Sequence, residues 1–176
     1  GGGEVARYFG RHGGKGVSKA VFISSVAPGM LKSDDNPEGV TRDVFEGIRE
    51  GLRQDRPAFL AEFFKDFYGQ DTETGGVSDA ILEWSRDMAM IASPRATLEC
   101  VNAFGLTDFT ADAAQITVPT LVIHGTGDKT VPIAATARRM AKLVPHATLI
   151  EYEGAPHGLT ATEPDRVVRD LLDFLG

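Results

Sequence analysis

Cysteine is nearly absent from the sequence: Cys100 stands alone among 176 residues, so no disulfide can form within the chain. No apolar run approaches the roughly 20 residues that a membrane-spanning helix needs, and no stretch has the pattern of a signal peptide. These absences give no sign of an oxidising compartment or of a membrane. We therefore expect a cytoplasmic protein with no membrane partner.

An excess of basic residues is also missing. Lys and Arg together number 18 against 25 Asp and Glu, a formal charge of -7, and the basic residues do not gather in one tract. This balance argues against nucleic acid as the main partner and favours a small neutral or apolar ligand. With 42% hydrophobic residues, the chain is long enough to bury a sizeable core.

Three short apolar stretches predict strands, at 19–28, around 121–123 and at 146–152. The middle one, Leu-Val-Ile, is an unbroken apolar run with two β-branched residues, of the kind that parallel strands show when both their faces are covered. Helical patterns surround these strands, at 1–14, 132–143 and 163–175. This alternation predicts an α/β fold with a mostly parallel sheet of about three strands.

The composition changes between residues 29 and 105, where helical patterns follow one another without a strand. Seven of the ten Phe residues lie between Phe45 and Phe109. We interpret 29–105 as a helical cap inserted into a core made of 1–28 and 106–176. The Phe residues then either line an apolar pocket beneath the cap or form an ordinary helical core.

Two residues are candidates for catalysis. Asp128 follows the glycines after the 121–123 strand, and His157 lies in the glycine-flanked turn after the 146–152 strand. If these strands are neighbours, both side chains face one crevice at the carboxyl edge of the sheet, where ligands of α/β proteins bind. A carboxylate that orients an imidazole is the pair that activates a Ser or Cys nucleophile. The alternative is that both residues are structural.

Two other possible motifs are weaker. Residues 13–16, Gly-Gly-Lys-Gly, lack the Ser or Thr and the earlier Gly of a phosphate-binding loop. Ser24 and Ser25 do not stand in a Gly-x-Ser-x-Gly elbow, so we interpret them as structural serines.

The histidines do not have the spacing of a metal site. His124, His146 and His157 match neither the His-Glu-x-x-His nor the Cys-x-x-Cys pattern, and we expect no metal. His124 lies within the apolar strand, where we expect a hydrogen-bonded core residue.

Several segments resemble the cofactor-free bacterial haloperoxidase group of α/β-hydrolases, whose members are also described as aryl esterases and perhydrolases. These segments are residues 1–8, 84–89, 92–100, 118–125 and 154–159. The resemblance runs along essentially the whole chain and implies an α/β-hydrolase fold.

By this resemblance Asp128 is the acid and His157 the base of a catalytic triad, while Trp84 and Val131 contribute to the substrate pocket. It further implies acyl transfer from an ester or a carboxylic acid. Water then releases the acid, or hydrogen peroxide releases a peracid that oxidises halide. The resemblance implies no haem, metal or flavin.

The chain departs from the group at its start. In the group, glycines like those at 1–3 follow a Gly-x-Ser-Met elbow, and that serine is not among the 176 residues. We therefore expect the chain to match the C-terminal two-thirds of such an enzyme, to be inactive alone, and to be prone to self-association. A non-catalytic binding module, or a half-enzyme completed by a partner chain, are the alternatives.

Overall fold

The computed structural model describes all 176 residues and contains one sheet of three parallel strands in the order β1-β2-β3. The strands are β1 (Ala20–Ile23), β2 (Thr120–Gly125) and β3 (Ala147–Tyr152). Thr120 at the start of β2 lies opposite Ala20 on one side and Ala147 on the other. The predicted three-stranded parallel α/β arrangement is confirmed.

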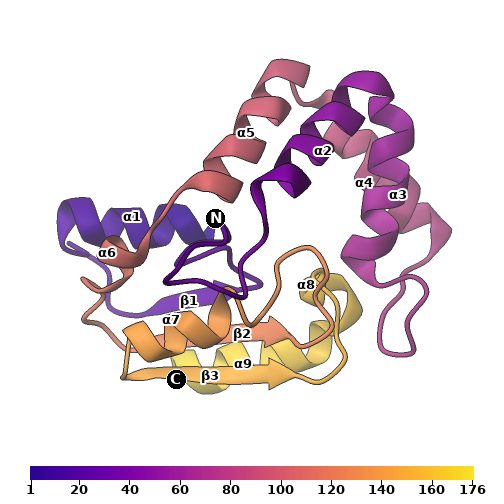
Figure 1. Cartoon of the computed structure of the whole chain (residues 1–176). Coiled ribbons are helices and arrows are strands. Elements are labelled where there is room, and N and C mark those ends of the chain that lie inside the picture. The colour runs from indigo at the N-terminus through magenta and orange to yellow at the C-terminus, as the bar shows by residue number, and fades with distance from the viewer.

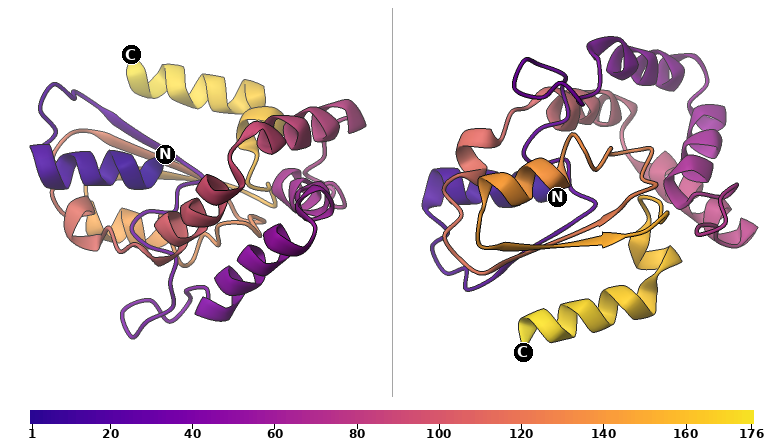
Figure 2. Two further views of the ribbon diagram at one scale, coloured as in Figure 1. Left: turned by 90° about the horizontal axis from the view of Figure 1, so that it is seen from above. Right: turned by 60° about the horizontal axis from the view of Figure 1, so that its bottom comes forward.

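Helices cover both faces of this sheet (Figure 2). The helices α1 (Gly2–His12) and α7 (Ala137–Leu143) lie on one face, and α9 (Pro164–Leu175) lies on the other. Every residue of β2 is buried as a result. This burial explains the continuous apolar run of β2, because a strand that is covered on both faces has no exposed side to carry polar residues.

Four long helices connect β1 to β2 and stand above the sheet and beyond its carboxyl edge (Figure 1). We call them the cap helices: α2 (Arg42–Gln54), α3 (Arg56–Tyr68), α4 (Asp79–Ile91) and α5 (Pro94–Leu106). Three of them begin at a side chain that accepts a hydrogen bond from a backbone amide of the first turn, namely Asp55, Ser78 and Ser93. Two single-turn helices complete the fold, α6 (Thr110–Ala113) and α8 (Leu159–Thr162).

Some predicted boundaries were too wide. The helix predicted at 132–143 begins only at Ala137, because residues 132–136 form tight turns in which Thr136 Oγ1 donates to the carbonyl of Pro132. The strand predicted at 19–28 ends at Ile23, because Ser24 has a φ of 46° that extended backbone does not adopt. The first helix, in contrast, stops where its two glycines predict: it ends at His12, and Gly13 has a φ of 59°, which is typical of a glycine at a helix C-terminus.

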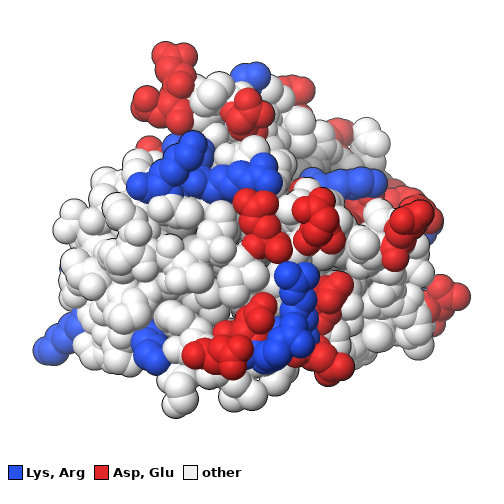
Figure 3. All heavy atoms as spheres, turned by 90° about the horizontal axis from the view of Figure 1, so that it is seen from below, with Lys and Arg blue, Asp and Glu red and all other residues white.

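The two outer strands, β1 and β3, each pair on one side only. No helix combines the length and apolar composition that a membrane span requires. On the face seen from below, Lys and Arg side chains lie beside Asp and Glu side chains, next to a broad uncharged area (Figure 3).

Candidate active site

Asp128 and His157 lie in two loops that touch one another. Gly125 is the last residue of β2 and Gly127 lies in the turn that follows, while the loop after β3 contains Gly154 and Ala155. A side chain at Gly125 would overlap the carbonyl of Ala155, and one at Gly127 would overlap the carbonyl of Gly154. Gly125 and Gly127 are therefore required for the close approach that brings acid and base together.

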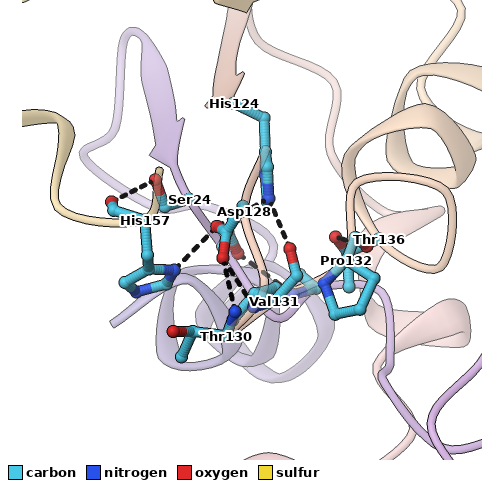
Figure 4. Close-up of polar contacts among 10 residues, drawn as sticks. Ser24, His124, Asp128, Thr130, Val131, Pro132, Thr136 and His157 are labelled. Atoms are coloured by element: carbon cyan, nitrogen blue, oxygen red, sulfur yellow. Dashed lines mark hydrogen bonds and ion pairs between the residues drawn. The ribbon is translucent and has the colours of Figure 1, made fainter. Parts of the chain in front are cut away.

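The acid and the base are hydrogen-bonded (Figure 4). His157 Nδ1 lies 2.8 Å from Asp128 Oδ2. An ionised carboxylate only accepts hydrogen bonds, so Nδ1 carries the proton and Nε2 is left as the basic nitrogen. The Asp128 side chain is fully buried, whereas that of His157 is 17% exposed and borders a cavity. This is the arrangement of a buried orienting acid and an accessible base.

Two backbone amides and a second histidine also contact the Asp128 carboxylate. The backbone amides of Thr130 and Val131 donate to Oδ1 at 2.9 and 2.7 Å. The Nε2 atom of His124 lies 3.1 Å from Oδ2. Burial alone would raise the pKa of this carboxyl, but hydrogen bonds from the two histidine rings, the charge on protonated His157 and the Val131 amide together hold that pKa below its ordinary 3.8. The acid therefore stays ionised at neutral pH.

The loop that carries His157 is held from two sides. Ser24 Oγ donates to the carbonyl of His157 at 2.8 Å, from the end of β1. The amide of Gly158 donates to the carbonyl of Phe67 at 2.9 Å, from the end of α3. The Phe67 ring also meets the His157 ring edge-on, with centroids 4.6 Å apart. Both the core and a cap helix thus fix the position of the base.

A cavity of about 1170 Å³ opens beside His157, between the sheet edge and the cap helices. Val131 lines it and also packs in the core of the cap helices. The opening glycines of the chain, Gly1 to Gly3, line the same cavity as His157. The apolar side chains that form its wall are mainly these: Ile23, Val26, Met30, Val40, Val44, Phe45, Ile48, Phe63, Phe67, Phe104, Phe109 and Val131.

The structure brings three of the four predicted site residues together. Asp128, His157 and Val131 lie within one turn and its neighbouring loop, but Trp84 does not join them. Trp84 is 65% exposed on α4 and does not line the cavity. The sequence shows that the helix carrying Trp84 is amphipathic, but it does not show which way the apolar side of that helix faces.

Phe67 and Ser24 contact His157 but were not predicted as site residues. Phe67 was one of several Phe residues at helical spacing, and spacing alone does not identify the one that reaches the base. Ser24 was interpreted as structural, and its hydroxyl does bind backbone, but the backbone is that of His157. Its position at the end of a strand is the signal that pointed toward the site.

The third histidine considered as a metal ligand, His146, lies apart from the site and binds the carbonyl of Val118. Side chains of His, Cys, Asp and Glu do not come together in groups of three or more that could hold a metal ion. His124 is fully buried and hydrogen-bonded, as predicted.

Comparison with known proteins agrees with this geometry. The family model of the alpha/beta hydrolase fold matches residues 1–164, and the chain belongs to that family. A non-heme chloroperoxidase of Streptomyces lividans is 43% identical over 176 residues, covering 99% of this chain and 64% of the relative. A bifunctional esterase/perhydrolase of Acinetobacter calcoaceticus is 38% identical, with coverage of 99% and 64%.

A solved structure also supports membership of this family. The bromoperoxidase from Bacillus anthracis superposes with a TM-score of 0.93 at 40% identity, covering 99% of this chain and 64% of that one. The chain therefore spans less than two-thirds of the length of these relatives. The resemblance to the haloperoxidase and esterase group is confirmed, as is the match to part of the α/β-hydrolase fold.

Proposed function

We propose that Asp128 and His157 are the acid and base of a serine-hydrolase-type acyl transfer. The hydrogen bond of 2.8 Å between His157 Nδ1 and Asp128 Oδ2 carries this proposal. In the proposed reaction, Nε2 of His157 takes the proton of an attacking serine hydroxyl, and the buried carboxylate stabilises the imidazolium that forms. The base then returns the proton to the leaving group.

The nucleophile has to come from outside these 176 residues. Ser24 is the serine whose hydroxyl binds the base residue, but it donates to the His157 carbonyl rather than approaching the ring. Gly1 to Gly3 line the cavity beside His157, which supports delivery of a serine by residues that directly precede them in a longer chain. By themselves the 176 residues have acid and base without nucleophile or oxyanion hole, and we expect background activity only.

The substrates we propose are small acyl compounds, namely esters or carboxylic acids, with water or hydrogen peroxide as the acceptor. The apolar wall of the cavity supports an apolar acyl group. Release to peroxide gives a peracid, which oxidises halide in solution, so no cofactor is part of the proposal. The names of the relatives, chloroperoxidase and esterase/perhydrolase, support this pair of outcomes.

We further propose that residues 29–105 act as a cap over a core of 1–28 and 106–176, with Val131 at the boundary of the pocket. Helix α5 extends one residue past this division, to Leu106.

Trp84 stays a predicted pocket residue, for which the cavity wall in this structure gives no support. Cytoplasmic location, the exclusion of nucleic acid and self-association through the outer strands also remain proposals.

One test joins the chain to the N-terminal third of the Streptomyces lividans relative and assays an aryl ester, then peroxide with carboxylic acid and bromide. We expect activity in the joined protein and background in the chain alone. The variant His157→Ala should lower kcat by about 10³-fold or more, because the base is lost. His146→Ala, at a histidine away from the site, is the control.

The two alternatives give different results in the same assay. A half-enzyme becomes active when the two parts are mixed without being joined. A binding module, favoured by the size of the cavity, binds apolar acids without turnover even in the joined protein. An active joined protein that is unaffected by His157→Ala would refute the proposed base. Reading the coding DNA upstream of Gly1 for Gly-x-Ser-Met is the quickest first check.

A further inference from the structure

His124 is a buried polar residue in the middle of the apolar sheet. It is the fifth residue of β2 and is fully inaccessible to solvent. Its Nε2 atom lies 2.8 Å from the carbonyl oxygen of Val131 and 3.1 Å from Asp128 Oδ2 (Figure 4). A buried imidazole costs free energy unless it is hydrogen-bonded, so both contacts bear on why a histidine is tolerated there.

The contacts define which nitrogen carries the proton. A carbonyl oxygen can only accept, so Nε2 of His124 carries the proton and donates it to Val131, and the same nitrogen lies beside the ionised Asp128 Oδ2. The other nitrogen, Nδ1, is buried without a hydrogen-bond partner. A second proton there would bury an N–H with no acceptor, which is unfavourable. The contacts of His124 therefore fit a hydrogen-bond donor at Nε2.

His124 is one of three residues, besides His157, whose polar groups contact the Asp128 carboxylate. The amides of Thr130 and Val131 donate to Asp128 Oδ1, while Nε2 of His124 donates to the Val131 carbonyl and lies 3.1 Å from Asp128 Oδ2. The amides anchor one oxygen, and the rings of His157 and His124 both lie against the other. The polar N–H of His124 beside Oδ2 favours the carboxylate orientation in which this oxygen faces His157.

We propose that His124 is a positioning residue of the acid–base pair, whose Nε2–H keeps Asp128 Oδ2 where His157 Nδ1 donates to it. This inference rests on the proposed function for its catalytic meaning, but its geometry lies wholly within these 176 residues. The competing explanation is structural: His124 satisfies the Val131 carbonyl and has no effect on the acid.

Nuclear magnetic resonance of the 176-residue chain distinguishes the positioning role of His124 from the structural explanation. The readouts are the Nδ1 proton of His157 and the carboxyl titration of Asp128. The variants are His124→Gln, whose amide reaches the position of Nε2, and His124→Asn, whose amide is too short to reach it. His146→Asn is the matched control at a histidine that binds only the Val118 carbonyl.

In the wild type and in His124→Gln we expect a His157 Nδ1 proton protected from solvent exchange, and an Asp128 pKa below 3.8. In His124→Asn this proton should broaden through exchange, and Asp128 should titrate at higher pH, because the acid has lost a donor. The control should match the wild type. A folded His124→Asn variant with both readouts unchanged overturns the proposal.

Two further measurements keep the proposal testable if His124→Asn does not fold. The ring nitrogen shifts of wild-type His124 must show the Nε2–H tautomer, and a proton on Nδ1 instead overturns the proposal. In the joined protein, His124→Asn should lower kcat about 10- to 100-fold at unchanged KM, with His124→Gln restoring it. An inactive wild-type joined protein counts against the proposed function alone, since the resonance readouts need no turnover.

Discussion

The strand β2 and the cap helix α4 place their apolar residues differently. Every residue of β2 is buried between helices, whereas α4 has no buried residue at all and exposes Trp84, Met88 and Ile91 on one side. Acid and base stand on loops of the closely packed sheet, and the cap helices supply much of the apolar cavity wall. This chain therefore keeps its hydrogen-bonded Asp128 and His157 on the closely packed part and much of its apolar cavity wall on the less buried part.

The largest expected effect on the free energy of unfolding is at a buried isoleucine, which we compare with an exposed one. Ile123 in β2 is 0% exposed, and Ile91 in α4 is 80% exposed. Ile123→Ala should lower the free energy of unfolding by about 2–5 kcal/mol, because it leaves a cavity between sheet and helices. Ile91→Ala should change it by less than about 0.5 kcal/mol. Denaturant titration measures both, and equal losses would remove the distinction between the two regions.

An intermediate effect on stability is expected from the substitution of Asp128. The pKa of Asp128 is lowered in the folded chain, so its charged form adds stability above pH 3.8 that is lost as the pH falls through the lowered pKa. Asp128→Asn should reduce stability at neutral pH by about 1–3 kcal/mol, since a donor then faces donors. Its stability should also fall less steeply than that of the wild type below pH 3.8.

Thermal unfolding at a series of pH values measures this difference. Asp87→Asn, at an exposed carboxylate on α4, is the control from the cap and should change stability by less than about 0.5 kcal/mol. A parallel decline of Asp128→Asn and wild type at acid pH would show that the folded structure does not lower the pKa of Asp128.

The smallest expected effect on stability comes from two glycines within the cap helices. Gly47 in α2 has open space where a side chain would stand, whereas a side chain at Gly105 in α5 would overlap the Phe45 ring. Gly47→Ala should stabilise the chain by about 0.5–1 kcal/mol through helix propensity. Gly105→Ala should destabilise it despite the same propensity, because Phe45 must move. Two stabilising substitutions would mean that α2 and α5 pack loosely even at this contact.

The sequence predicted those elements whose cause is local. The run Leu121 to Ile123 predicted β2, and the glycine-rich strand exits pointed to Asp128 and His157. The resemblance to a known group of hydrolases supplied the roles of the pair, which spacing alone had left open.

The features that the sequence did not predict depend on long-range packing. The exposure of Trp84 depends on how α4 sits against its neighbours, and the edge-on contact of Phe67 with His157 joins residues far apart in the chain. The helix start at Ala137 was missed because Ile133 and Met140 continue a helical spacing across turns that are not helical. Period and propensity carry no information about such contacts.

The attachment of α3 to the loop of the base has a mechanical consequence. Besides the hydrogen bond from Gly158 to Phe67, Thr74 Oγ1 donates to the carbonyl of Gly154 at 2.6 Å, so the same loop is fastened at two points to the cap side. If α3 swings outward to admit a ligand, it either breaks these bonds or drags the base away from the acid. These two hydrogen bonds therefore couple the position of the His157 loop, relative to Asp128, to the position of the cap.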